Sequence, residues 1–578
     1  MKRINNIIKS AALGLTGLMF FSCSDFLEIE PLNEIVLEKF WNEESDVENI
    51  VAGCYSAMQS QTIIDRMMAW GEFRSDNIIG GTKVEDDVNL SNIFKENINA
   101  SNGYTNWGEF YEIINRCNTV LYYAPSVAEK DPNYTESELN ATRAEVSAIR
   151  DLCYFYLIRA FRDVPYTTQP YLDDTQQMDQ PATKFNDVLD SLILDLESVR
   201  TYAVKKYPET STYYQHGRIT QNAIHSMLCE MYLWKQDYVN AVKYADMVID
   251  AMTDDYQKDL DKAGSSLSSS DKMIDGFPLI SDQSTSAGSG YGNAYNEIFG
   301  TGDSRESIFE LIFMNNDNML ANYSVSYRYG NITTFPGNVK AAAFVGADPE
   351  NDVNPVFLSK YDTRYYENLN VLSTSNIGIA KYAVRSVTVN TTSSTITTTR
   401  GGYWPEKYCH ANWILYRLTD VMLMKAEALV QMVNTEDTTA VGKENNDSLL
   451  HQAFTIVNAV NKRSNCSTSS QDLTYSAYSS KSLMANLVLD ERQRELMFEG
   501  KRWFDLVRRS RRDGNTNYLI NQVTRKGSDN ASVVQSKLAK MDAIYWPYNI
   551  NELKVNSNLV QNPAFGSGEE DSYKNSSK

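Results

Sequence analysis

Apolar side chains recur every three to four residues over much of the chain, and this spacing places them on one face of an α-helix. Between about residues 43 and 61 the recurring apolar positions are Val47, Ile50, Val51, Cys54 and Met58. The same spacing returns in residues 107–124, 137–163 and 184–201. The pattern predicts a mainly α protein built from long amphipathic helices.

Two neighbouring segments have the pattern of a helical hairpin. RITQNAIHSMLCEMYLW is followed by DYVNAVKYADMVIDA, with a three-residue connection at 235–237. Leu228 and Tyr232 lie one turn apart on the first segment, and Ala241 and Ala245 lie one turn apart on the second. Small residues at this spacing let two helices approach closely, as in tetratricopeptide-like repeats.

A second candidate pair lies near the C-terminus. WILYRLTDVMLMKAEALVQM and SLLHQAFTIVNAVNKRS both have helical periodicity, and a polar insert at 434–447 separates them. Together with the first pair, these segments predict a helical-repeat scaffold.

Helical periodicity fades between residues 253 and 411. SSLSSSD, SDQSTSAGSGYGN and VTVNTTSSTITTTRGG are rich in Ser, Thr and Gly, whereas SIFELIFM and KYAVRSVTV are typical of short strands. We interpret 253–411 as a loop-rich, partly β insertion that carries the ligand site, because long loops on a rigid scaffold usually serve function. It separates an N-terminal helical region, 23–252, from a C-terminal region, 412–578.

The first 22 residues have the pattern of an export signal. MKRINNIIKS is basic, and AALGLTGLMFF is an apolar run too short to cross a bilayer. Ser22-Cys23 follows, and Cys after a small residue is the bacterial lipobox pattern, here without the usual Leu three positions before the Cys. We expect residues 1–22 to be removed and Cys23 to carry a lipid; the alternative is an ordinary signal peptide with an incidental Cys.

Composition and charge exclude several classes of function. The formal net charge is −20, which disfavours a nucleic-acid partner. The cysteines show no CxxC spacing, the four histidines show no HExxH spacing, and no GxSxG motif is present. We expect no metal and no cofactor, with a structural calcium left open.

The stretch ERQRELMFEGKRWFDL, residues 491–506, is the strongest candidate for acid–base chemistry. Glu495 and Glu499 lie four residues apart, a spacing that suits the carboxyl separation of a glycosidase pair. Arginines lie between the acids, however, and cations lower carboxyl pKa values, whereas a general acid needs a raised one. We therefore expect an ion-pair ladder, in which Glu499 reaches Arg502, and Asp505 reaches Arg508 or Arg509.

Tyrosine is abundant, with 36 residues against 21 Phe, and several lie in polar segments where burial does not explain them. Aromatic faces suit sugar rings, and neighbouring Asn side chains suit their hydroxyl groups. Local loop packing is the alternative for each residue. Besides Tyr403 and Asn296, the candidate ligand-binding residues are Asn102, Tyr104, Tyr291, Asn293, Tyr295, Tyr323, Tyr327, Tyr329 and Trp404.

An ordered set of motifs resembles the SusD/RagB family of Bacteroidota outer-membrane lipoproteins, from Cys23 almost to the C-terminus. The motifs are CSDFLEIEP, FWNEESDVENIVAGCYSAM, NWGEFYEIINRCNTVL, AEVSAIRDLCYFYLIRAFRDVPY, DYVNAVKYADMVI, RLTDVMLMKAEAL, ERQRELMFEGKRWFDLVR and IYWPYNINELKVNSNLVQNPAF. Two positions depart from the family pattern: Arg162 stands where Gly usually precedes DVP, and Tyr548 follows WP where Ile-Pro is common.

The resemblance implies about four tetratricopeptide-like helix pairs with an irregular ligand-binding part. It also implies a non-enzymatic, surface-exposed outer-membrane lipoprotein that captures glycans for a TonB-dependent SusC-like barrel. Ligand residues vary in the family, so no motif assigns them. Three alternatives stay open: a peptide-binding, RagB-like member, a secreted helical glycosidase, and a repeat scaffold without a small ligand.

Overall fold

The computed structural model describes residues 40–566, apart from short gaps. The gaps are 174, 209, 211–212, 265–271, 284–289, 315–320, 331–337, 393–394, 406–407, 467–472 and 528–530. The predicted signal peptide and Cys23 lie outside the described residues.

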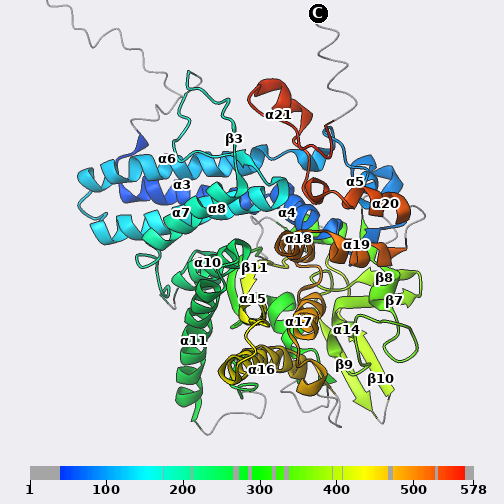
Figure 1. Ribbon diagram of the computed structural model, residues 1–578. Helices are drawn as coiled ribbons and strands as arrows, with labels where there is room; N and C mark the ends of the chain where they lie inside the picture. Colours follow the sequence, from blue (N-terminus) through cyan, green and yellow to red (C-terminus); the bar gives the residue numbers. More distant parts are fainter. Residues whose placement is uncertain are drawn as a thin grey trace, which may run out of the picture.

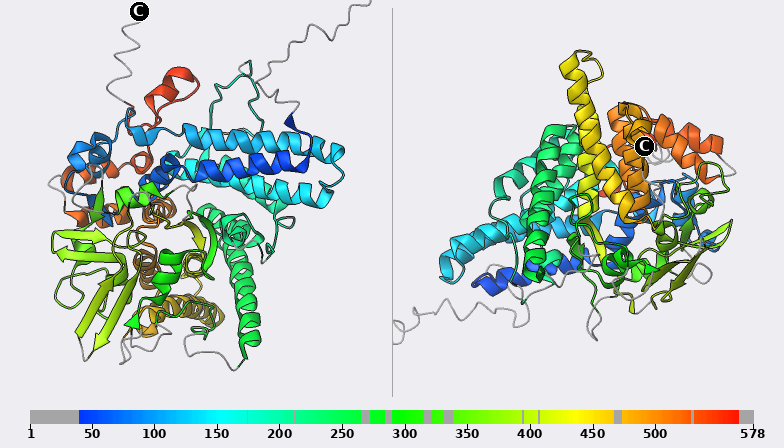
Figure 2. Two further views of the ribbon diagram at one scale, coloured as in Figure 1. Left: turned by 180° about the vertical axis from the view of Figure 1, so that it is seen from behind. Right: turned by 90° about the horizontal axis from the view of Figure 1, so that it is seen from below.

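Long helices form the upper layer in Figure 1, where they lie side by side. They are α3 (Glu44–Met58), α6 (Gly108–Lys130), α7 (Glu136–Phe161) and α8 (Phe185–Val199). α6 packs on both α3 and α7, and α7 packs on α8. The view from behind in Figure 2 shows the same layer above the rest of the molecule. The predicted mainly helical, tetratricopeptide-like scaffold is confirmed.

The first predicted hairpin is confirmed as α10 (Gln221–Lys235) and α11 (Tyr238–Ala263), which pack against each other. Gln236 makes the turn in the left-handed conformation, with φ of 64°. α11 continues to Ala263, so the predicted domain boundary after residue 252 lies inside a helix.

The second predicted pair is confirmed in part. α15 (Leu418–Met432) packs on α16 (Ala440–Arg463), but α16 begins within the segment predicted to be a polar insert. The first residues of the predicted helix instead form strand β11 (Trp413–Arg417), which pairs with β5 (Ser307–Leu311). A short apolar run fits a buried strand as well as a buried helix, so periodicity alone did not separate them.

The middle of the chain contributes most of the strands. One sheet has the order β1 (Ile78–Gly80), β6 (Val339–Ala341), β8 (Asn376–Ile379) and β7 (Leu369–Ser373). A second has the order β10 (Thr395–Arg400), β9 (Val387–Thr392) and β4 (Gly290–Tyr291). β2 (Val164–Pro165) pairs with β3 (Ala182–Thr183). The strand predicted in SIFELIFM is confirmed as β5, whereas KYAVRSVTV becomes extended only from Val387.

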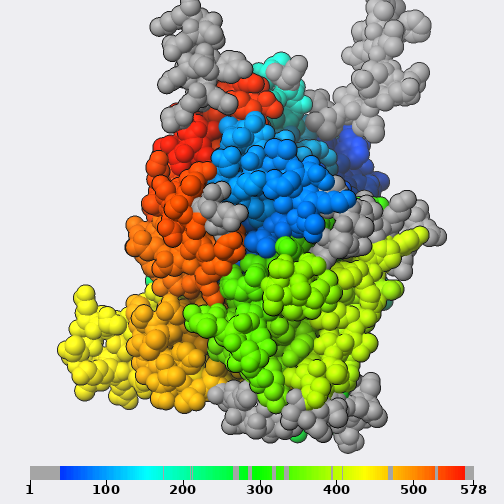
Figure 3. Space-filling model, turned by 90° about the vertical axis from the view of Figure 1, so that its right-hand side faces the viewer, coloured from blue at the N-terminus to red at the C-terminus, as the bar shows by residue number. Residues whose placement is uncertain are grey.

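Several shorter helices connect these layers. They are α4 (Gln61–Met68), α5 (Val88–Phe94), α9 (Tyr214–Gly217), α12 (Asn293–Tyr295), α13 (Tyr323–Arg328), α14 (Thr363–Asn368), α19 (Asn517–Val523), α20 (Ala531–Leu538) and α21 (Ile550–Val555). In Figure 3 the orange surface of the C-terminal helices borders the green surface of the middle region. None of the helices in the described part is long and apolar enough to cross a membrane.

The acid-rich stretch 491–506 is two helices rather than one. α17 (Lys481–Leu496) ends before a turn, and α18 (Arg502–Asp513) begins after it. Phe498 and Gly500 in this turn have φ of 69° and 70°. The turn lies directly on the π-helical segment Ala69–Phe73, where a Cβ on Gly71 would be 1.8 Å from the Gly500 carbonyl oxygen.

Gly71→Ala is expected to lower the free energy of unfolding by about 3 kcal/mol, because the new methyl group meets backbone rather than a side chain that can rotate away. Gly53→Ala in α3 is the control, since a Cβ there meets no atom within 4 Å and removal of a helical glycine stabilises by about 0.5–1 kcal/mol. Urea unfolding of both variants measures the difference. Equal stability of the two variants would contradict the close backbone contact.

Candidate functional site

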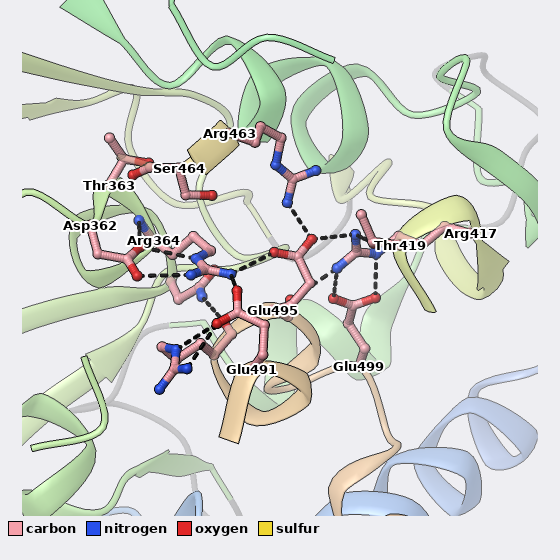
Figure 4. Close-up of polar contacts among 12 residues, drawn as sticks. Asp362, Thr363, Arg364, Arg417, Thr419, Arg463, Ser464, Glu491, Glu495 and Glu499 are labelled. Atoms are coloured by element: carbon pink, nitrogen blue, oxygen red, sulfur yellow. Dashed lines mark hydrogen bonds and ion pairs between the residues drawn. The ribbon is translucent and has the colours of Figure 1, made fainter. Parts of the chain in front are cut away.

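The three glutamates of the acid-rich stretch lie in a buried charged cluster (Figure 4). Glu495 accepts hydrogen bonds from Arg364 at 2.9 Å and Arg417 at 2.7 Å, and it also pairs with Arg463. The four residues come from α17, α14, β11 and α16. One carboxylate therefore joins four segments that are distant in sequence.

The flanking acids are paired in the same way. Glu491 pairs with Arg364 at 2.7 Å and with Arg494 at 2.8 Å. Glu499 accepts from Arg417 at both oxygens, at 2.7 and 2.9 Å, and from Lys381 at 2.6 Å. Each of the three carboxylates has at least two cationic partners.

Cations decide the protonation state of this cluster. Burial by itself raises the pKa of Glu495, but Arg463, Arg417 and Arg364 outweigh it and hold the pKa well below its ordinary value. The pKa values of Glu491 and Glu499 are also lowered, because their cationic partners outweigh the effect of burial. These carboxylates stay ionised and cannot act as general acids near neutral pH.

The ion-pair ladder is confirmed, but only some of its predicted partners are. Asp505 pairs with Arg508 at 2.8 Å as expected. Arg502 pairs with Asp76 at 2.8 Å rather than with Glu499. The difference arises because the turn at 497–501 separates Glu499 from α18, so helical spacing does not hold across it.

Four of the predicted ligand-binding residues are buried, and the structure corrects the expectation that they face a ligand. Tyr295 donates to two carbonyl oxygens, of Ala380 and Val384, each at 2.9 Å. Tyr329 donates to the Phe498 carbonyl at 3.1 Å. The exposed fractions are 1% for Tyr295, 0% for Tyr329, 2% for Asn102 and 8% for Tyr104. The Tyr295 and Tyr329 hydroxyls and the Asn102 amide therefore serve internal hydrogen bonds rather than a ligand.

Asn102 has a structural role that spacing did not indicate. Its side chain accepts from the Tyr104 backbone N–H at 3.0 Å and donates to the Asn89 carbonyl at 2.9 Å. It therefore caps the short 3₁₀ helix Gly103–Thr105 and fixes the position of Tyr104.

Two half-buried tyrosines gather on α13, next to Tyr104. The Arg328 guanidinium lies 5.0 Å from the Tyr327 ring centroid and 5.8 Å from that of Tyr104. Arg328 is held in turn by Asp65 of α4 at 2.8 Å. Tyr323 lies one turn before Tyr327 on the same helix. The structure thus brings together three of the predicted aromatic residues.

The segment made of residues 403–405 and 408–411 meets the start of α13 at Cys409 and Ala411. Asn322 donates to the carbonyl oxygens of Cys409 and Ala411, both at 2.8 Å. On this segment the half-buried Trp404 ring meets His410 edge-on, with centroids 5.5 Å apart. The Trp404 Nε1 and both His410 ring nitrogens have no hydrogen-bond partner among the described residues. All three nitrogens are themselves buried and do not reach the surface of the described structure.

Sequence reasoning missed two residues of this segment. They are Tyr408 and His410. Tyr408 is 61% exposed. Burial lowers the pKa of His410, which keeps its ring neutral near pH 7. The clustering of Tyr403, Trp404 and Tyr408 was the available signal for Tyr408. We call Tyr323, Tyr327, Trp404, Tyr408 and His410 the aromatic surface.

Tyr291 and Asn293 are placed elsewhere in the fold. Tyr291 lies on β4 opposite Val389 of β9. Asn293 donates to the Ser281 carbonyl at 3.1 Å and to Glu297 at 2.8 Å. No contact recorded among the described residues joins either one to the aromatic surface.

The described part of the chain contains no arranged metal site and no disulfide bond. No cluster of three or more His, Cys, Asp or Glu side chains has metal-binding geometry there. The described cysteines are buried thiols: Cys54, Cys117, Cys153, Cys229, Cys409 and Cys466. The expectation about calcium stays a prediction.

Comparisons with known proteins agree with the architecture. The model of the SusD family matches residues 208–565, and a model described as "Starch-binding associating with outer membrane" matches residues 25–233. "SusD-like protein P38" of Formosa agariphila is 25% identical over 585 residues, covering 97% of this chain and 99% of that protein.

Solved structures share the fold at lower identity. A SusD superfamily protein from Bacteroides vulgatus has a TM-score of 0.63 at 15% identity and covers 91% of this chain and 100% of its own. One from Bacteroides thetaiotaomicron has a TM-score of 0.61 at 18% identity, covering 91% and 99%. A "Laminarin binding SusD-like protein" has a TM-score of 0.58 at 18% identity, covering 90% and 100%.

Glu495→Gln is expected to lower the free energy of unfolding by about 3–5 kcal/mol, because buried arginines lose their counter-charge. The ionised Glu495 stabilises the fold above its ordinary pKa of 4.5, and this contribution is lost as pH falls through the lower pKa of the folded state. The variant should therefore lose less stability than the wild type on acidification below about pH 4.5.

Glu85→Gln is the control for this prediction. Its partner Lys95 lies 2.9 Å away, and both side chains are more than half exposed. No measurable change in unfolding is expected. Chemical denaturation at pH 7 and pH 4 compares the three proteins, and a Glu495→Gln variant as stable as Glu85→Gln would contradict the role of the cluster.

Proposed function

Because the chain belongs to the SusD family, we propose that it is a glycan-binding lipoprotein of the outer membrane. It captures an oligosaccharide or polysaccharide at the cell surface and passes it to a TonB-dependent SusC-like barrel. The family match over residues 208–565 supports this reading, as does the description of the model that matches residues 25–233.

The aromatic surface is the observation that carries the glycan proposal. Its rings come from α13 and from residues 403–405 and 408–411. Sugar rings present an apolar C–H face that stacks on aromatic rings, with hydroxyl groups at the rim. Tyr408 is 61% exposed, and its phenolic hydroxyl can hydrogen-bond to those groups. A laminarin-binding protein with the same fold is consistent with this assignment.

The pKa values favour capture over hydrolysis. Burial raises the pKa of both Glu72 and Glu310 to about 7, the value expected of a general acid. Both are fully buried, however, and their oxygens accept hydrogen bonds from inside the fold. The acids at Glu491, Glu495 and Glu499 are held ionised. We therefore propose a protein that binds glycan without cleaving it.

Export and anchoring follow from the N-terminal segment. The basic start, the short apolar run and Ser22-Cys23 support a lipid on Cys23 after removal of residues 1–22. In this proposal the lipid holds the protein at the membrane that contains the barrel.

Titration calorimetry of residues 24–578 with a panel of polysaccharides and their oligosaccharides tests the glycan proposal. We expect saturable binding without hydrolysis. Tyr327→Ala, Trp404→Ala and Tyr408→Ala should each weaken binding by about tenfold, since one lost stacking contact of about 1–1.5 kcal/mol corresponds to that factor.

Tyr122→Ala is the matched control, because Tyr122 is 57% exposed but lies on α6, outside the aromatic surface. Its binding should equal that of the wild type. Binding of peptides in place of glycans would instead favour the peptide-binding alternative, and release of reducing ends would contradict the non-enzymatic proposal.

Cys23→Ala in the full-length protein is expected to move the chain from the membrane fraction to the soluble fraction, because the acyl chains can no longer be attached. Immunoblots of fractionated cells and metabolic labelling with a fatty acid measure this change. Cys54→Ala serves as the control, since Cys54 is a buried core thiol. Membrane retention of Cys23→Ala at the wild-type level would overturn the anchor assignment.

A further inference from the structure

A cavity lies among the C-terminal helices and shares no lining residue with the aromatic surface. Its volume is about 510 Å³, within the range of small-molecule sites. α17, α19 and the segment 354–358 line it, together with Arg525. The lining is mostly polar, which sets the chemistry of any occupant.

The α17 wall of this cavity carries a carboxylate without a partner. Asp490 is half-buried and makes no ion pair or side-chain hydrogen bond among the described residues. Burial raises its pKa, and Arg494, Arg502 and Arg525 act in the opposite direction without contacting it. Two of these cations already have acidic partners: Arg494 pairs with Glu491, and Arg502 pairs with Asp76.

The same cavity is also lined by a guanidinium without an acidic ion-pair partner among the described residues. Arg525 donates to the Gln522 side chain at 3.0 Å and to the Asn354 carbonyl at 2.8 Å, and it lies 4.1 Å from the Phe344 ring centroid. These neutral contacts fix the group in place, and Asp490 and Asp76 act on its charge only from beyond ion-pair distance. No carboxylate among the described residues forms an ion pair with it.

The two charges belong to one cavity and do not touch each other. Most other half-buried or buried arginines of the C-terminal region have a carboxylate within ion-pair distance, as Arg494, Arg502 and Arg508 do. A half-buried carboxylate and a half-buried guanidinium kept apart across a cavity match a ligand that carries both opposite charges. A ligand with a single charge pairs with only one of these two side chains.

We propose that this cavity binds a small zwitterion of the α-amino-acid type. Its ammonium group pairs with Asp490, and its carboxylate pairs with Arg525. The side chain of the ligand lies against Tyr518, Pro355 and Leu358, which line the same space. This site is independent of the glycan site and adds a second ligand class to the protein.

Titration calorimetry of residues 24–578 with the twenty common amino acids tests the proposal. We expect at least one of them to bind saturably. Its deaminated analogue, which lacks the ammonium, and its decarboxylated analogue, which lacks the carboxylate, should each bind at least about tenfold more weakly, because each leaves one charged wall unpaired.

Two variants test which side chain of the cavity pairs with which charged group of the ligand. Asp490→Asn should weaken the amino acid by about tenfold and leave the deaminated analogue unchanged, whereas Arg525→Gln should weaken the amino acid and leave the decarboxylated analogue unchanged. Lys537→Gln is the control, since Lys537 lines a separate cavity of about 430 Å³.

Absence of binding for all twenty amino acids, or equal binding of an amino acid and both analogues, would overturn the proposal. The analogue series uses the wild type, so it decides the question even if one variant fails to fold. Glycan titrations of the same samples keep the two sites distinguishable: loss of amino-acid binding with glycan binding intact concerns this cavity alone.

Discussion

The fold depends on the pairing of charges that it buries. Glu491, Glu495 and Glu499 are each at most 3% exposed, and an unpaired carboxylate there would cost several kcal/mol. Arg364, Arg417 and Arg463 supply the partners, so α14, β11, α16 and α17 must meet at one place. Each of these carboxylates therefore favours the packing that brings its cations within ion-pair distance.

The aromatic surface is held by the same principle on a smaller scale. Arg328 ties α13 to α4 through Asp65, and its guanidinium lies between the Tyr327 and Tyr104 rings. Asn322 holds the start of α13 to the segment that carries Trp404 and Tyr408. Rings from variable, polar segments are thus fixed by buried hydrogen bonds and ion pairs. A pre-organised stacking surface loses little conformational entropy when a ligand binds.

The partners of a charged residue were predictable only within a continuous helix. Asp505 reaches Arg508 as helical spacing requires, whereas the turn at 497–501 sends Glu499 to Arg417 and Arg502 to Asp76. The candidate ligand-binding residues also fall into two groups that the sequence did not separate. Tyr327 and Trp404 are half-buried in one region, but Tyr295 and Tyr329 lie in the core because buried carbonyl groups needed their hydroxyls. A tyrosine in a polar segment has the same sequence signature in both situations.

The helical scaffold, the α10–α11 hairpin and the ordered motifs of the SusD family could be predicted from the amino-acid sequence. Those features rest on local periodicity and on residue order, both of which are written along the chain. Only the tertiary structure decided which acids share a cation, which tyrosines reach the surface, and that Asp490 and Arg525 line one cavity. These outcomes depend on contacts between segments far apart in sequence, and burial changes the energy of a charge or a hydroxyl group by more than local propensity does.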